Sequence, residues 1–233
     1  MSFLWPYLTA LLALLLASVR ANTEKVIFLA PAHTTFPDAA PSLDSLFLDT
    51  LTPEVSTLRL AVPVAFPAEH QPRGLVSWYL LRGLNKGQRY EVRICWAAIQ
   101  PTELWLDVFN ITHVFDTPDL IQSLAAFSEQ KVPKNPVHID TDLQRPLVTD
   151  ESVLFLRLNA AADFFTTNET LMRDPPSVDS ELILDPFLAN IFPQSLVPTA
   201  FYITILAIGS YFLSKAIWLG LSSSAIEAKK HKN

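Results

Sequence analysis

A run of apolar residues from Val197 to Leu221 constrains this chain more than any other stretch. The segment from Thr199 to Leu213 carries no charged residue, and Lys215 is the one charge before Leu221. About 20 apolar residues, each rising about 1.5 Å in a helix, cross the roughly 30 Å hydrocarbon core of a bilayer. The run therefore predicts a transmembrane helix over residues 197–221. A buried helix of a soluble protein is the alternative, although such helices rarely run this long without a polar face.

The charges on either side of this run indicate its orientation. From Asp174 to Ser214 there are carboxylates but no Lys or Arg, whereas Lys215 lies near the end of the run and lysines follow it at 229, 230 and 232. Lys and Arg are enriched on the cytoplasmic side of membrane spans, so we expect residues 222–233 to form a short basic cytosolic tail. Residues 22–196 then lie on the opposite side, in the lumen of the secretory pathway.

The N-terminus predicts a signal peptide over residues 1–21. A short Leu- and Ala-rich run from Leu11 to Ala17 is followed by Val19 and Ala21, which occupy the two positions that favour cleavage after Ala21. An uncleaved anchor is the alternative. Cleavage together with the C-terminal span predicts a single-pass type I membrane protein.

The last five residues, Lys-Lys-His-Lys-Asn, place Lys229 and His231 five and three positions from the end. This pattern resembles the KxHxx variant of the dibasic signal that returns membrane proteins to the endoplasmic reticulum. Such signals are addresses read by a receptor and contribute nothing to anchoring. The resemblance implies residence in the endoplasmic reticulum membrane. Lysines that only stop translocation are the alternative.

The composition of residues 22–196 excludes several classes of protein. This region carries 12 Lys and Arg against 22 Asp and Glu. An acidic domain repels phosphate backbones, so we expect no nucleic-acid partner. Cys95 is the only cysteine in the chain, which excludes an internal disulfide and CxxC redox chemistry. A reduced structural cysteine is expected at Cys95, and pairing with another chain is the alternative.

The clearest strand pattern runs from Arg89 to Trp96, where apolar and polar residues alternate as in a strand with one buried face. Upstream, Leu84, Gly87 and Tyr90 form L-x-x-G-x-x-Y. This motif resembles the tyrosine corner of fibronectin type III and related sandwiches, and the resemblance covers residues 74–109. It implies that strands at 78–82 and 89–96 lie in different sheets and that the phenol hydroxyl binds upstream backbone.

Further elements continue beyond this region. Thr117 and Pro118 predict a helix start, and Leu120, Leu124 and Phe127 share one helical face. Residues 153–158 predict a strand that is buried on both faces except at Arg157. The expected fold is therefore mainly β: a β-sandwich-like lumenal domain over 22–196 with a helical elaboration, plus one C-terminal transmembrane helix.

Catalytic motifs are missing from the sequence. No P-loop, G-x-G-x-x-G, G-x-S-x-G or H-E-x-x-H pattern is present, and we predict no catalytic residue, cofactor or metal. His113 and Asp116 are read as a surface pair. Sequons at Asn110 and Asn168 predict N-glycosylation in the lumen. Aromatic residues at 78, 96 and 105 could line a sugar site, but strand tryptophans in this pattern are more often core.

These features predict a non-catalytic accessory protein or subunit of an endoplasmic-reticulum membrane complex in protein or GPI/glycan biogenesis. The layout of signal peptide, β-rich domain, single span and basic tail resembles type I subunits of translocon-associated, membrane-insertion and GPI-mannosyltransferase assemblies. The expected partners are the lipid bilayer and membrane-protein subunits. A membrane-tethered carbohydrate-binding receptor or enzyme is the alternative, and it requires convergent polar residues in a pocket.

Overall fold

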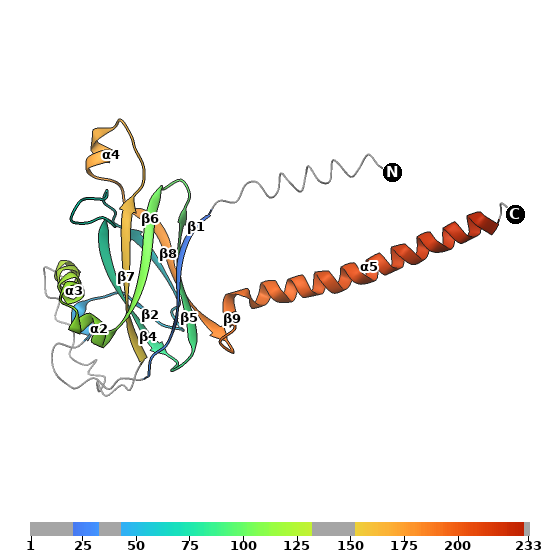
Figure 1. The fold of residues 1–233 in the computed structure, drawn as a ribbon, viewed down its shortest axis with the longest axis horizontal. Coiled ribbons are helices and arrows are strands. Elements are labelled where there is room, and N and C mark those ends of the chain that lie inside the picture. The colour runs from blue at the N-terminus through green and yellow to red at the C-terminus, as the bar shows by residue number, and fades with distance from the viewer. Residues whose placement is uncertain (1–20, 33–42, 132–151, 231–233) are drawn as a thin grey trace.

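A computed structural model describes residues 21–32, 43–131 and 152–230. The predicted signal peptide up to residue 20 lies outside the described residues, and so does His231. The described chain is built around two β-sheets, from which one long helix projects (Figure 1). The mainly β fold with a C-terminal apolar helix is thereby confirmed.

Sequence-distant strands form each of the two sheets. The first sheet has the order β1-β5-β8-β3, with β9 paired to β8, and the second has the order β2-β4-β7-β6. All pairings are antiparallel except the short one between β2 and β4. The strands of the first sheet are β1 (Ala21–Leu29), β5 (Arg89–Ala97), β8 (Val178–Leu188), β3 (Thr57–Val62) and β9 (Phe192–Pro193); those of the second are β2 (Thr50–Leu51), β4 (Leu75–Leu84), β7 (Ser152–Ala162) and β6 (Thr102–Asn110).

The chain crosses between the sheets at the turn from β4 to β5, where the tyrosine motif had implied such a crossing. The next strand departs from a fibronectin-type arrangement, in which the last two strands are neighbours in one sheet. Here β6 pairs with β7 in the opposite sheet. The reason is that both edges of β5 are already occupied, one by β1 and the other by β8.

The main core lies between the two sheets, and its largest fully buried members include Tyr90, Ile94 and Leu182. A second apolar cluster lies on the outer face of the β4 and β7 strands, around Trp78 and Phe155. Both of these strands are therefore buried on two faces. This confirms the prediction for residues 153–158, where all but Arg157 are buried.

Helices cover that outer face. They are α2 (Ile111–Asp116) and α3 (Pro118–Lys131), which lie beside the second sheet in Figure 1. The predicted helix start at Pro118 is confirmed, and Leu120 and Leu124 are buried against the sheet. Trp78 is fully buried there and its indole N–H donates to Ser123 Oγ at 3.1 Å. It is therefore a core residue and not part of a sugar site.

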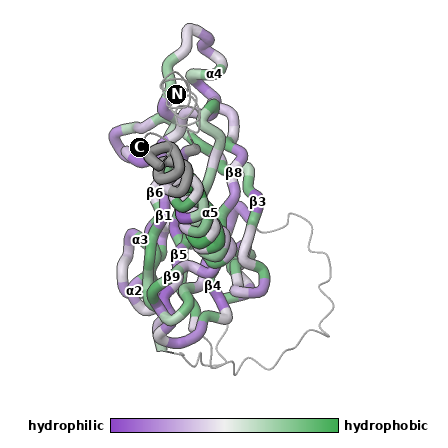
Figure 2. The backbone as a smooth tube through the Cα atoms, turned by 90° about the vertical axis from the view of Figure 1, so that its right-hand side faces the viewer, coloured by the Kyte–Doolittle hydropathy of each residue, from purple (hydrophilic) through white to green (hydrophobic). Residues whose placement is uncertain are grey.

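The short elements are η1 (Leu43–Leu46), α4 (Glu169–Arg173) and η3 (Gln194–Leu196), and η3 leads into α5 (Val197–Lys230). Helix α5 has 34 residues, which corresponds to about 51 Å. The helix projects away from the sandwich (Figure 2), and its large apolar side chains are exposed. The helix is long and apolar enough to cross a membrane over Gln194–Ser222. It also continues through most of the predicted tail, which is helical up to Lys230.

Candidate functional site

The site that stands out is the junction between the sandwich and α5. We use "junction" for the end of β8, the turn into β9, and η3. Only a few residues separate the last strand from the helix, so whatever fixes η3 against the sheet also fixes the direction in which α5 leaves the domain (Figure 1). Two sets of polar contacts do this.

The first set is a charged network on the outer face of the first sheet. Two carboxylates there are almost entirely buried: Glu91 on β5 is 5% exposed and Asp185 on β8 is 4% exposed. They are register partners across the two strands. Arg93 Nη1 lies 3.4 Å from Glu91 Oε1 and 3.3 Å from Asp185 Oδ2. Lys25 Nζ on β1 donates to Glu91 Oε2 at 3.2 Å.

Asp185 extends this network into η3. Its Oδ1 accepts a hydrogen bond from the backbone N–H of Ser195 at 3.1 Å, and its Oδ2 accepts one from the Ser195 hydroxyl. Arg93 also donates to that hydroxyl at 3.5 Å. A buried carboxylate is tolerated only when its charge is paired and its oxygens accept hydrogen bonds. Arg93 pairs the charge of Asp185 from within the sheet, whereas the two hydrogen bonds from Ser195 are made only while η3 stays in place against the sheet.

The second set is a clip made by one side chain. Asn190 lies in the turn after β8 with a φ of 59°, a left-handed conformation that asparagine adopts more readily than most residues. Its Oδ1 accepts from the backbone N–H of Arg89 at 2.8 Å, and its Nδ2 donates to the carbonyl of Gly87 at 2.9 Å. The clip therefore joins the turn that precedes α5 to the turn between β4 and β5.

The predicted tyrosine motif lies in that same β4–β5 turn. Leu84 and Tyr90 are buried, and Gly87 has a φ of 72°, which favours glycine. The Tyr90 hydroxyl accepts from the backbone N–H of Asn85 at 3.0 Å and donates to Gln88 Oε1 at 3.0 Å. The backbone N–H of Asn85 lies upstream of Tyr90, so the hydroxyl binds upstream backbone as the resemblance implies. The contribution of the motif to stability stays a prediction.

The turn also contacts the junction directly. Gln88 Nε2 donates to the carbonyl of Phe187 at 3.1 Å, next to the end of β8. The Arg89 guanidinium lies 5.9 Å from the ring centroid of Phe187. The tyrosine motif, the Asn190 clip and the charged network thus form one connected set of contacts at the base of α5.

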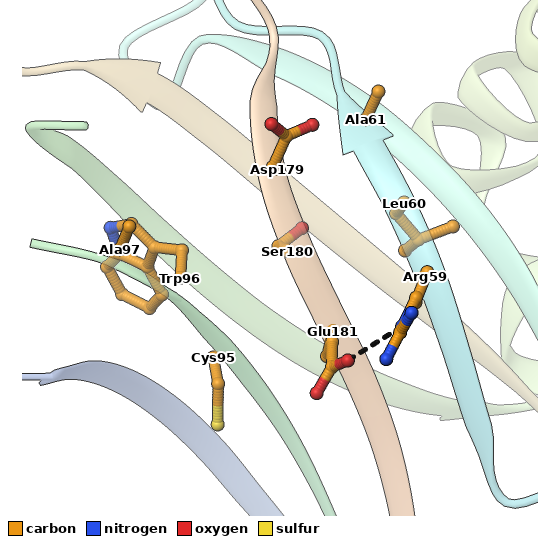
Figure 3. A pocket seen from close by; sticks show the side chains of 9 residues that line it. All are labelled: Arg59, Leu60, Ala61, Cys95, Trp96, Ala97, Asp179, Ser180 and Glu181. Atoms are coloured by element: carbon orange, nitrogen blue, oxygen red, sulfur yellow. Dashed lines mark hydrogen bonds and ion pairs between the residues drawn. The ribbon is translucent and has the colours of Figure 1, made fainter. Parts of the chain in front are cut away.

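A shallow groove lies farther along the outer face of the first sheet (Figure 3). It has a volume of about 600 Å³ and is lined by residues of β3, β5 and β8, Cys95 and Glu181 among them. Arg59 Nε donates to Glu181 Oε1 at 2.9 Å, and Cys95 Sγ lies 3.6 Å from Thr23 Oγ1. One exposed ion pair and one thiol do not amount to a catalytic arrangement. Within the described ranges, no group of three or more His, Cys, Asp or Glu side chains could hold a metal ion.

The other candidate residues from the sequence are dispersed. Asn110 precedes α2 and Asn168 precedes α4, and both are exposed, as a glycosylation acceptor must be. His113 stacks on Phe109 with ring centroids 5.7 Å apart, on the far side of the sandwich from the junction. The backbone at Lys229 belongs to α5, while its proposed partner in the retrieval signal, His231, lies outside the described residues.

Sequence reasoning did not find the charged network or the Asn190 clip. The alternating pattern placed Glu91 and Arg93 on a solvated face, and Asp185 was counted only as part of an acidic flank. The one signal that could have indicated Asp185 is a carboxylate that directly follows the apolar run Leu182–Leu184 of this strand. Its partner Arg93 is 92 residues away in the sequence, so no local pattern connects the two.

Fold and junction together define a class of protein: a β-sandwich fixed by a buried ion network to one long apolar helix. Comparison with known proteins gives the family. The chain belongs to the Pga1 family, described as GPI-mannosyltransferase II co-activator, whose profile matches residues 12–216. This family description agrees with the prediction of a non-catalytic accessory protein.

One curated relative adds to this assignment. It is a GPI mannosyltransferase 2 subunit of Schizosaccharomyces pombe, 23% identical over 145 residues. The aligned region covers 62% of this chain and 56% of that protein, so the chain spans little more than half of its relative's length. No solved structure matches.

Proposed function

We propose that this protein is a non-catalytic subunit that binds and activates GPI-mannosyltransferase II in the endoplasmic reticulum membrane. The observation that carries the proposal is the family match, which extends through the sandwich and into α5 as far as residue 216. The matched span therefore covers the positions of the charged network and the Asn190 clip as well as most of the apolar helix. The relative's name, a subunit of the same enzyme, supports the proposal.

A co-activator without chemistry of its own must act through binding. A protein can shift another protein's conformational equilibrium only by binding one state more tightly than the other. Such selectivity requires contacts held in a fixed relation to one another. The junction supplies this, because it couples the direction of α5, which would bind within the membrane, to the orientation of the sandwich outside it.

Co-purification tests this proposal. We expect the tagged full chain, solubilised in mild detergent, to recover a membrane-embedded mannosyltransferase in stoichiometric amount. Microsomes depleted of this protein should lose most mannosyl transfer to the GPI precursor, and adding back the full chain should restore it. Recovery of free protein only, with unchanged transferase activity after depletion, would refute the proposed function.

We further propose the domain boundaries and topology that the sequence indicates. Residues 1–21 form a cleaved signal peptide, 22–196 a lumenal domain glycosylated at Asn110 and Asn168, 197–221 the span, and 222–233 a cytosolic tail with Lys229 and His231 as a retrieval signal. The support is the acidic flank before α5 and the lysines after it.

Protease protection measures this topology. Protease added to intact microsomes should remove only the tail and leave the sandwich whole, and the glycans should stay sensitive to the glycosidase that cuts immature high-mannose chains. Digestion of the sandwich in sealed microsomes would contradict the orientation. Mature glycans on the unchanged protein would contradict residence in the endoplasmic reticulum.

A further inference from the structure

Exposed apolar side chains gather around the base of α5. Ile191, in the turn between β8 and β9, is 79% exposed, and its neighbours on both sides in this turn are also exposed or half-exposed. The outer face of β1 adds two more. We call this set the apolar rim; it comprises Ile27, Leu29, Leu188, Ile191, Phe192 and Leu196.

The register of the first sheet brings the two parts of the rim together. Leu29 on β1 pairs with Arg89 on β5. Arg89 in turn contacts the β8 side: its guanidinium lies over the Phe187 ring, and its backbone N–H donates to Asn190 Oδ1. Leu29 is thus separated from the β8–β9 turn by a single strand. Figure 2 views the domain from the side toward which α5 projects, and β1, β5 and β8 lie around the base of the helix in that view.

The connection to α5 is short, which limits how far the rim can lie from a membrane. Val197 lies six positions after Ile191, so even a fully extended chain would span only about 20 Å between them. The actual path is more compact, because Ser195 is hydrogen-bonded to Asp185. If α5 crosses a bilayer, the rim lies at the level of its headgroups.

Positively charged side chains lie close to the apolar rim. Lys25 and Arg89 are exposed on the same face of the sheet, and Lys86 is exposed in the adjacent β4–β5 turn. Apolar side chains flanked by Lys and Arg are typical of protein surfaces that lie in the membrane interface, where the cations meet lipid phosphates. The remainder of the sandwich region is acidic, so this local arrangement is distinctive.

We propose that the apolar rim inserts into the headgroup region of the lumenal leaflet, so that the end of the outer face of the β1–β5–β8–β3 sheet around the β8–β9 turn lies against the membrane. This rests on the proposed membrane anchorage by α5. Lipid is the occupant because the rim is continuous through Leu196 and Val197 with the apolar surface of α5. The sandwich would then be held at a fixed height, with α2 and α3 on the side that faces the lumen.

Site-specific fluorescence quenching tests the proposal on the full chain. Cys95→Ser removes the native thiol, and Ile191→Cys then carries an environment-sensitive fluorophore. The matched control is Ile99→Cys, an apolar position that is 89% exposed and lies in the turn between β5 and β6, at the opposite end of the sandwich. A third variant, Ile208→Cys, places the probe in the middle of α5.

The proteins are reconstituted into phosphatidylcholine vesicles that carry a nitroxide near the top of the acyl chain. We expect at least about threefold stronger quenching at 191 than at 99, because interfacial side chains lie about 5–10 Å into the headgroup and acyl boundary. Quenching at 208 but not at 191 would overturn the rim proposal while leaving anchorage intact. Quenching at neither position would overturn both. A probe at 191 that is shielded from water but not quenched by lipid would indicate a protein occupant and also overturn it.

Discussion

Tyr90→Phe should lower the free energy of unfolding of the sandwich by about 1–3 kcal/mol, because it removes the hydroxyl and leaves a polar partner unsatisfied. The hydroxyl is buried and accepts the backbone N–H of Asn85 while donating to Gln88. A backbone N–H cannot rotate to a new acceptor. Thermal or denaturant unfolding of the purified full chain, followed by tryptophan fluorescence, measures the change.

Tyr79→Phe is the matched control for this substitution. Tyr79 is buried on β4, and burial raises the pKa of its hydroxyl to about 12, with a smaller opposing contribution from a hydrogen bond to Ser77. Because the Ser77 hydroxyl can rotate to another partner, the loss should be smaller than for Tyr90→Phe. An equal or larger loss at Tyr79 would show that the Tyr90 hydroxyl does not act as a tyrosine corner.

Local patterns in the sequence were sufficient to predict individual helices and strands of the fold. Helix α3 begins where Thr117 and Pro118 indicated, and its buried face carries Leu120 and Leu124 as their spacing required. Strand β5 buries Tyr90, Val92 and Ile94 on one face. These predictions succeeded because periodicity, helix capping and proline geometry act over a few residues and so are visible in one stretch of sequence.

The strand order could not be predicted in this way. Pairing of β5 with β1 and β8 joins residues about 60 to 100 positions apart, and it is these pairings that leave β6 to pair with β7. A resemblance limited to residues 74–109 carries no information about those partners. The β4–β5 crossover was therefore anticipated while the neighbour of β6 was not.

The contacts of the junction could not be predicted from the sequence for the same reason. On the outer face of β5, Glu91 and Arg93 occupy positions that an alternating pattern assigns to solvent, and they are shielded only because β1, β8 and η3 converge there. The burial of a charge depends on its partner, and the partner is supplied by tertiary structure. Buried ionic positions are for this reason harder to predict than apolar ones.

Asp185→Ala should have a large effect on both stability and co-activation. It would leave Arg93 with only Glu91 on that side and remove both acceptors of Ser195. Removing one partner of a buried ion pair costs about 3–5 kcal/mol, and we expect about 2–4 kcal/mol here since Arg93 is partly exposed and keeps one carboxylate. Freed from the sheet, η3 would no longer fix the direction of α5, so transferase activity in microsomes should fall even at temperatures where the sandwich stays folded.

Glu181→Ala is the matched control, because Glu181 lies on the same strand and face and also pairs with an arginine, Arg59. That pair is exposed, and such pairs contribute less than about 1 kcal/mol. A third variant, Ser195→Ala, keeps the backbone hydrogen bond to Asp185 and should give an intermediate loss of activity with little loss of stability. If Asp185→Ala and Glu181→Ala unfold alike and support equal mannosyl transfer, the charged network does not couple the sandwich to the helix, and co-activation must depend on surfaces other than this junction.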